Sequence, residues 1–222
     1  MAAQIKSKKR VSDHGEVYTN EREVNAMLDL VEQETERIDS RFLEPACGTG
    51  NFLVEVLRRK LEVVQRRYRK QQLEYERYGI IAISSLYGID LLMDNVEECK
   101  ERLYAIFEKR YRKLFPKSVK DECLQSVRFI LEKNIIRGDA LTLNKVNTDE
   151  PIVFAEWSAV NGSMIKRRDY TMANLLESQP IEGPNLFSDL GDKAFIPRPV
   201  NDFPLVHFLK LCQMEKTSTN EK

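Results

Sequence analysis

Leu43-Glu-Pro-Ala-Cys-Gly-Thr-Gly-Asn-Phe-Leu53 is the stretch that decides the fold of this 222-residue chain. Apolar residues lead into Glu44 and Pro45, and a Gly-x-Gly turn follows at Gly48 and Gly50. The sequence therefore predicts a strand, a tight turn and a helix. Glycines let such a turn pass close to a ligand, and the unpaired amides at a helix N-terminus carry partial positive charge. We therefore expect a ligand site at this turn.

The dinucleotide fingerprint Gly-x-Gly-x-x-Gly is incomplete, because Leu53 stands where its third glycine belongs. By itself Gly-x-Gly predicts an ordinary turn equally well. The whole string, however, resembles the first motif of the DNA methyltransferases that modify adenine N6 with S-adenosylmethionine (SAM), which is Asp/Glu-Pro-Ala-Cys-Gly-x-Gly-x-Phe-Leu. The resemblance implies SAM as cofactor. It assigns to the cofactor site Glu44, Pro45, Ala46, Cys47, Gly48, Gly50, Asn51 and Phe52.

A second segment of the same family lies upstream. Residues 21–31 predict a helix that begins after a Thr19 or Asn20 cap, and its apolar stripe is Val24, Met27, Leu28 and Val31. As a bare pattern this is an ordinary capped helix. The preceding Gly15-Glu-Val-Tyr-Thr-Asn20 also resembles the family motif Gly-Glu-x-Tyr-Thr-Pro, with asparagine in place of proline. That likeness implies that Tyr18 and Thr19 lie against the methionine end of SAM.

Two further strands are predicted to end in acids. Tyr87-Gly-Ile-Asp90 resembles the family motif Tyr-Gly-x-Asp, which places Asp90 on the ribose hydroxyls, with Leu91 beside it; the alternative is a plain strand-end acid. After a third strand in residues 134–143, Gly138-Asp-Ala-Leu141 resembles the motif whose aspartate accepts from the adenine amino group. This assigns Asp139 and Ala140 to the site. The alternative is an aspartate that only closes a turn.

The family pattern breaks after a fourth strand at Pro151–Ala155. Adenine-N6 enzymes carry Asn/Asp-Pro-Pro-Tyr/Phe at this position. The amide or carboxylate oxygen of its first residue and a backbone carbonyl accept the hydrogens of the target amine, and its aromatic ring stacks on the flipped base. This chain has no Asn-Pro-Pro or Asp-Pro-Pro. Glu156 and Trp157 are the candidates for those catalytic roles, although no proline pair preorganises them.

These elements predict an α/β, Rossmann-like methyltransferase fold with a mostly parallel sheet in the order 3-2-1-4 and a reduced C-terminal half. The exposed edge of strand four calls for a cover, from residues 181–212, a second copy or a partner subunit. The expected organisation is a flexible basic arm at 1–13, a SAM-binding domain at 14–160 and an extension at 161–222 with a helix and Pro/Gly-rich loops. The predicted helices span 51–78, 92–133 with a break near 115–117, and the latter part of 164–180, with Asp169 as its cap.

Charge and cysteine usage narrow the class of protein. Thirty-five basic and 35 acidic residues balance, so any DNA-binding surface must be local. The basic clusters Arg58–Lys70 and Lys166–Arg168, and the arm residues Lys6, Lys8, Lys9 and Arg10, could contact phosphate. Solvated charge is the simpler interpretation, with Glu62, Glu74 and Glu76 balancing the first cluster. Four scattered cysteines predict free thiols and no metal site. We expect a cytoplasmic protein without a signal sequence or membrane span.

Three functions follow from these observations. The first is a SAM-dependent adenine-N6 DNA methyltransferase of a restriction–modification system, which binds DNA with a specificity subunit, a nuclease/helicase subunit or a second copy of itself. No separate target-recognition domain fits in the chain. The second is a non-catalytic, SAM-binding scaffold subunit. The third, a methyltransferase for a substrate other than DNA, is disfavoured by the Pro-Ala-Cys-Gly-Thr-Gly-Asn-Phe string.

Overall fold

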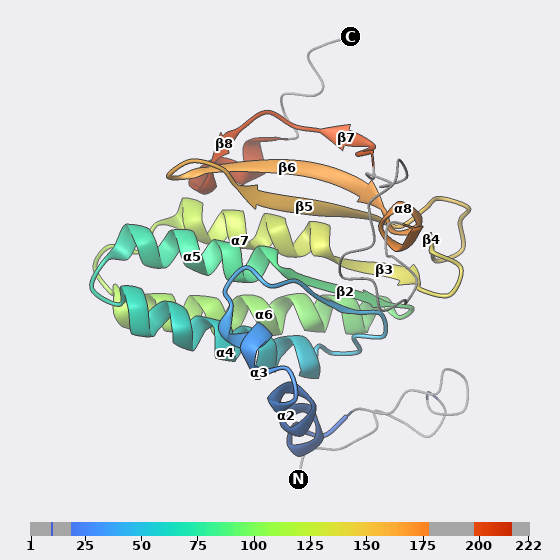
Figure 1. Cartoon of the computed structure of the whole chain (residues 1–222), viewed down its shortest axis with the longest axis horizontal. Helices are drawn as coiled ribbons and strands as arrows, with labels where there is room; N and C mark the ends of the chain where they lie inside the picture. The colour runs from blue at the N-terminus through green and yellow to red at the C-terminus, as the bar shows by residue number, and fades with distance from the viewer. Residues whose placement is uncertain (1–9, 11–18, 178–197, 215–222) are drawn as a thin grey trace, which may run out of the picture.

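The computed structural model describes residues 10, 19–177 and 198–214, in a mixed α/β arrangement (Figure 1). Its parallel sheet consists of β1 (Phe42–Glu44), β2 (Leu86–Asp90) and β3 (Ile135–Asp139), in the order β1-β2-β3. A two-residue strand, β4 (Asn144–Lys145), pairs antiparallel with β3. The expected adjacency of strands three, two and one is therefore confirmed. Tyr18 lies outside the described residues.

Each connection between parallel strands contains two helices. The first pair is α4 (Asn51–Tyr68) and α5 (Gln72–Ser84), and the second is α6 (Met93–Leu114) and α7 (Asp121–Asn134). α4 packs against α6, and α5 packs against α7. The break near residues 115–117 is confirmed. The single helix predicted over 51–78 is wrong, because the chain turns at 69–71 and lets α4 and α5 pack against each other.

The apolar pattern of α4 predicted its buried face. Leu53, Val54, Leu57, Leu61 and Val64 are all buried, as the helical period indicates. Val56 and Val63 are buried as well, because α4 packs against helices on more than one side. Each fully buried valine or leucine contributes about 1.5–3 kcal/mol relative to an exposed one. α4 is therefore the central helix of the core, and it starts at the glycine turn.

Two short helices precede β1: α2 (Glu21–Asp29) and α3 (Glu32–Glu36). Asn20 caps α2, because its Oδ1 accepts a hydrogen bond from the Glu23 amide at 3.0 Å. Of the predicted stripe, the residues that α4 covers are buried, whereas Met27 is 53% exposed and Val31 is 42% exposed.

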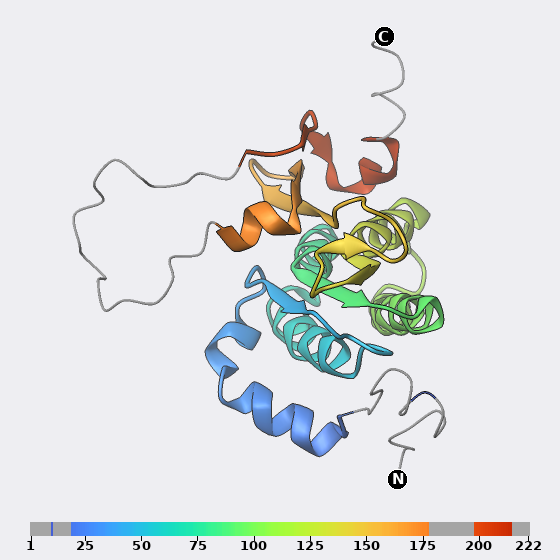
Figure 2. The same ribbon diagram turned by 90° about the vertical axis from the view of Figure 1, so that its right-hand side faces the viewer.

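The C-terminal part forms a second, antiparallel sheet that packs over α5 and α7 (Figures 1 and 2). It contains β5 (Val153–Ala159), β6 (Met164–Thr171), β7 (Asn201–Asp202) and β8 (Val206–His207). A helix, α8 (Met172–Glu177), follows β6, and the 3-10 helix η1 (Phe208–Gln213) packs on α7. A compact C-terminal part thus covers one side of the parallel sheet and its helices.

The fourth predicted strand does not join the parallel sheet, so the expected order 3-2-1-4 is wrong at its last position. β5 pairs instead with β6 over seven residues, from Val153↔Thr171 to Ala159↔Ile165, and β1 ends the parallel sheet. Residues 201–207 do cover a strand edge, but that of β6. Residues 181–197 of the expected cover lie outside the described part.

Asp169 is a strand residue and not the helix cap that the sequence predicts. Its carboxylate accepts two hydrogen bonds from Arg167, at 2.7 and 2.8 Å, and both side chains are almost completely buried. The alternation of Ile165, Arg167 and Asp169 toward the core is that of a strand. Charged side chains can occupy buried strand positions only when they pair with each other, as Arg167 and Asp169 do. The alternation of apolar and polar residues in the sequence does not reveal such a pair, so the strand was not predicted.

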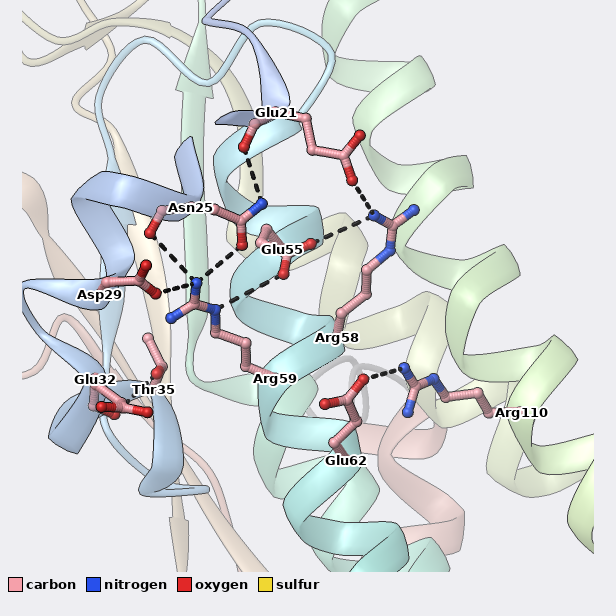
Figure 3. A network of polar contacts seen from close by, with 10 residues as sticks. All are labelled: Glu21, Asn25, Asp29, Glu32, Thr35, Glu55, Arg58, Arg59, Glu62 and Arg110. Carbon is pink, nitrogen blue, oxygen red and sulfur yellow. Dashed lines mark hydrogen bonds and ion pairs between the residues drawn. The ribbon is translucent and has the colours of Figure 1, made fainter. Parts of the chain in front are cut away.

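Three arginines of the basic cluster Arg58–Lys70 form ion pairs: Arg58 and Arg59, which Figure 3 shows, and Arg66, which lies 3.6 Å from Glu36. Arg58 contacts Glu55 and Glu21, and Arg59 contacts Asp29, Asn25 and Glu55. Of the predicted balancing acids, Glu62 pairs with Arg110, but Glu74 pairs with Arg77 and the fully buried Glu76 pairs with Lys120. In the second cluster, Lys166–Arg168, the side chains of Lys166 and Arg168 contact Asp202. Arg10 of the predicted N-terminal arm contacts Asp94.

None of the described helices is long and apolar enough to cross a membrane.

Candidate cofactor site

A pocket of about 590 Å³ lies at the carboxyl ends of β1, β2 and β3. Open α/β sheets bind ligands at this edge. All predicted cofactor residues line this pocket except Gly50 and Tyr18, and Tyr18 lies outside the described residues. The lining set is Thr19, Glu44, Pro45, Ala46, Cys47, Gly48, Asn51, Phe52, Asp90, Leu91, Asp139 and Ala140. Segments from Thr19 to Ala140 thus meet around one cavity.

The glycine turn has the backbone that its sequence requires. Gly48 and Gly50 have φ angles of +52° and +85°, which L side chains rarely adopt. A Cβ on Gly50 would lie 2.5 Å from the Cys99 Sγ of α6. Gly50 therefore supports the turn from behind instead of lining the pocket, and its position allows α4 and α6 to pack closely.

Arg102 of α6 braces the turn, and the motif comparison did not identify it. One of its nitrogens donates to the Thr49 carbonyl at 2.6 Å, to Thr49 Oγ1 at 3.0 Å and to Asn51 Oδ1 at 2.9 Å. The Asn51 amide in turn donates to the Thr19 carbonyl at 3.0 Å. A single guanidinium thus ties the turn to the segment before α2. Nothing in the local sequence of α6 sets Arg102 apart from the other basic residues of that helix.

Asp90 holds the turn and faces the pocket. Its Oδ2 accepts from the Gly48 amide at 2.9 Å, and its Oδ1 accepts from the Leu92 amide at 2.8 Å and the Asn95 side chain at 3.2 Å. A carboxylate has about four acceptor positions, so these three bonds leave room for a ligand hydroxyl. The structural and ligand-binding interpretations of Asp90 are therefore compatible.

Glu44 is the acid with the most unused acceptor capacity. Its one hydrogen bond in the described part of the chain is a long one, 3.4 Å from the Ala46 amide. Partial burial raises the pKa of Glu44 above its usual value. A cationic or hydroxyl group placed in the pocket would stabilise its charged form.

Asp139 closes a turn, as the alternative interpretation expected, because its Oδ1 accepts from the Leu141 amide at 2.9 Å. The residue also lines the pocket, so the turn does not exclude a ligand contact. Motif reasoning missed five lining residues, Met27, Leu92, Asn95, Gly138 and Leu141. The structure alone shows that Leu141 is 95% exposed and that Met27, which the sequence placed in an apolar stripe, is exposed too; apolar side chains in solvent beside a pocket suit an apolar ligand face.

The cysteines are free thiols, as expected: Cys47, Cys99 and Cys123 are buried and Cys212 is half-buried. A hydrogen bond with Cys99, together with burial, raises the pKa of the Cys47 thiol, so Cys47 stays protonated and is no nucleophile. In the described ranges, no three His, Cys, Asp or Glu side chains gather to hold a metal ion.

Glu156 and Trp157 do not meet the cofactor residues. β5 places them at the amino ends of the parallel strands: Glu156 Oε1 lies 2.5 Å from Arg41, just before β1, and Trp157 Nε1 donates to Asn134, just before β3, at 3.0 Å. The length of β3 separates these ends by about 13 Å. Trp157 is only 7% exposed and packs edge-on against Phe129. In this arrangement Trp157 is a core residue.

Comparisons with known proteins agree with the motifs. Residues 17–153 match the family model described as MmeI, DNA-methyltransferase domain. A Methanocaldococcus jannaschii protein, described as a candidate type II restriction enzyme and methyltransferase, is 32% identical over 98 residues, which cover 42% of this chain and 8% of that protein. The chain thus spans a small fraction of that relative. No solved structure matches. Because the matched model covers more than half of the chain, the protein belongs to the family of the MmeI DNA-methyltransferase domain.

Proposed function

We propose that this chain is the SAM-binding part of an adenine-N6 DNA methyltransferase of a restriction–modification system, with a Rossmann-like fold that is reduced in its C-terminal half. The observation that carries the proposal is the pocket at the carboxyl ends of β1–β3, around which four separate motif segments converge. Bound SAM would supply a sulfonium-activated methyl group. The family membership supports DNA as the substrate class.

The residues of the pocket suit the chemistry of SAM. Asp90, at the end of the second strand, would accept from the ribose hydroxyls, and Asp139 would face the adenine amino group. Glu44 is half-buried and carries little hydrogen bonding of its own, so it suits the cationic methionine end of the ligand. The turn from Gly48 to Asn51, braced by Arg102, would hold the ligand against α4.

Transfer to an adenine amine needs acceptors for its hydrogens near the methyl group. Glu156 and Trp157, the candidates from the sequence, lie at the opposite end of the sheet. We therefore propose that a partner chain provides the acceptors and the reading of the DNA sequence. The same observation favours a second function, a non-catalytic SAM-holding subunit of such a complex.

Titration calorimetry with SAM and with S-adenosylhomocysteine tests the cofactor site. Binding of both ligands by the wild type is expected, and absence of binding would overturn the proposal. Tritiated SAM and genomic DNA then test catalysis, first with the chain alone and then with a specificity or nuclease/helicase subunit of the same restriction–modification system. Methyl incorporation only with the partner supports the first function. SAM binding without incorporation in either mixture supports the second.

A further inference from the structure

A second pocket, of about 560 Å³, lies at the amino ends of β1 and β2, away from the cofactor site. Arginines from four separate parts of the chain line it: Arg37 after α3, Arg41 before β1, Arg67 near the end of α4 and Arg77 in α5. The acids in its lining are Glu36 and Asp39. Glu36 lies 3.6 Å from Arg66, and Asp39 lies 3.9 Å from Arg37. Four arginines thus face two acids within the lining, and Glu156 and Glu74 pair with Arg41 and Arg77 from outside it.

Two of the arginines are incompletely paired. Arg67 is exposed and forms no ion pair within the described residues. The Nε of Arg77 is buried without a hydrogen-bond partner in the described part, although its NH1 lies 3.5 Å from Glu74. A buried donor without a partner destabilises the folded state. An acceptor that enters the pocket would remove that cost.

A buried cation lies directly behind the pocket wall. Lys60 is completely buried, and its ammonium donates to the carbonyls of Ile38 and Ser40 and to Ser85 Oγ at 2.6 Å. Ile38 and Ser85 are themselves lining residues. No carboxylate forms an ion pair with Lys60 among the described residues. Burial lowers the pKa of Lys60 to about 7, so its positive charge adds to the potential of the pocket only at about pH 7 and below.

The remaining wall is compatible with an anion. The hydroxyls of Ser84 and Ser85 donate to the carbonyls of Ile81 and Ala82, so these two carbonyls at the end of α5 are already occupied. Tyr78 forms an aromatic side of the pocket and stacks on Tyr68 with ring centroids 4.4 Å apart. Arginine clusters beside aromatic rings suit phosphate esters that carry a base or a sugar.

We propose that this amino-end pocket binds a phosphate group, held chiefly by Arg67 and Arg77, from a DNA backbone or from a free phosphate ester. The site is separate from the SAM pocket, so it extends the protein's contacts beyond the proposed cofactor function. A failed test here would leave SAM binding intact.

The test compares the double variant R67Q/R77Q with R112Q/R128Q, a control that loses the same charge from arginines paired with Glu108 and Glu101 outside the pocket. Fluorescence anisotropy with a labelled single-stranded oligonucleotide, and calorimetry with inorganic phosphate, measure binding. We expect R67Q/R77Q to lose at least about tenfold in affinity, since hydrogen bonds to charged groups contribute about 1.5–3 kcal/mol, and the control to lose less than about twofold. SAM affinity should be unchanged in both variants.

The source of the phosphate follows from competition. Displacement of the oligonucleotide by phosphate in the wild type identifies the DNA backbone as a ligand of this pocket. Phosphate binding without oligonucleotide binding identifies a free phosphate ester. Equal losses in the two double variants, or no phosphate binding by the wild type, would overturn the proposal. If R67Q/R77Q fails to fold, R67Q alone serves, because Arg67 is exposed.

Discussion

The two ends of the same parallel sheet carry pockets of similar size, about 590 and 560 Å³, with opposite chemistry. At the carboxyl ends, Glu44, Asp90 and Asp139 stand beside the amides of a glycine turn. At the amino ends, four arginines and two acids line the pocket, with the buried Lys60 behind its wall. The acids of the carboxyl end lie at the ends of the strands themselves, whereas the arginines of the amino end come from the helices and connecting segments that pack around the strands.

The largest expected effect concerns the amino-end residue Trp157. If Trp157 is a core residue, Trp157→Ala should lower the free energy of unfolding by about 3–5 kcal/mol, measured by urea denaturation, because it leaves a cavity beside Phe129. Trp157→Phe should lose less and bind SAM like the wild type. A Trp157→Ala protein of wild-type stability that has lost methyl transfer would instead make Trp157 catalytic.

At the carboxyl end, Asp90→Ala should weaken SAM binding by about 3 kcal/mol, on the order of 100-fold, because a charged acceptor for ligand hydroxyls and the bond to the Gly48 amide disappear together. Calorimetry measures the effect. Asp94→Ala removes a carboxylate that does not line the pocket, so it is the matched control. Equal affinities for the two variants would contradict the placement of the ribose at Asp90.

Lys60 makes stability at the amino end depend on pH. Burial lowers the pKa of Lys60 to about 7, whereas the unfolded chain has the ordinary value of 10.5. Between these values the unfolded state binds more protons, so the contribution of Lys60 to stability rises with pH, by about 2 kcal/mol from pH 7 to pH 9. Denaturation curves of the wild type and of Lys60→Met at several pH values should show this rise in their difference. A difference that does not vary with pH would contradict the lowered pKa.

The smallest effect is expected for Arg102, which acts on the ligand only through the turn. Arg102→Ala should weaken SAM binding by about 1 kcal/mol, roughly fivefold, and Arg102→Lys should restore part of the loss because it can still donate to the Thr49 carbonyl. Calorimetry measures the SAM affinity of each variant, and thermal denaturation measures its stability. A weaker affinity in a variant as stable as the wild type shows that Arg102 positions the turn for the ligand. A loss of stability with unchanged SAM affinity would assign Arg102 a structural role only.

Local motifs were enough to predict the carboxyl-end pocket. Its residues follow directly after short apolar strands, and the chain direction of a parallel sheet brings all such positions to one edge. The breaks between helices were harder to predict. The end of α6 has Pro116 nearby, whereas the end of α4 has no glycine or proline, so the turn at 69–71 was missed.

The C-terminal sheet was not predictable in the same way. Residues 151–155 are apolar enough for a parallel strand, and nothing local decides whether they pair with β1 or with β6. The pairing with β6 depends on the burial of Trp157 against Phe129 of α7, a contact between residues distant in sequence. It also depends on the buried Arg167–Asp169 pair, and Arg167 cannot be told apart from its basic neighbours in the sequence.

The sequence by itself therefore determined the strand–turn–helix motifs, because these depend on residues close together in the chain, and its motifs indicated the family, whose fold in turn predicted the order of three parallel strands. Only the tertiary structure decided where β5 lies, and with it the separation of Glu156 and Trp157 from the cofactor pocket. It also decided which arginines share a pocket with Lys60 behind it, because strand direction and side-chain pairing are settled by packing across the whole domain.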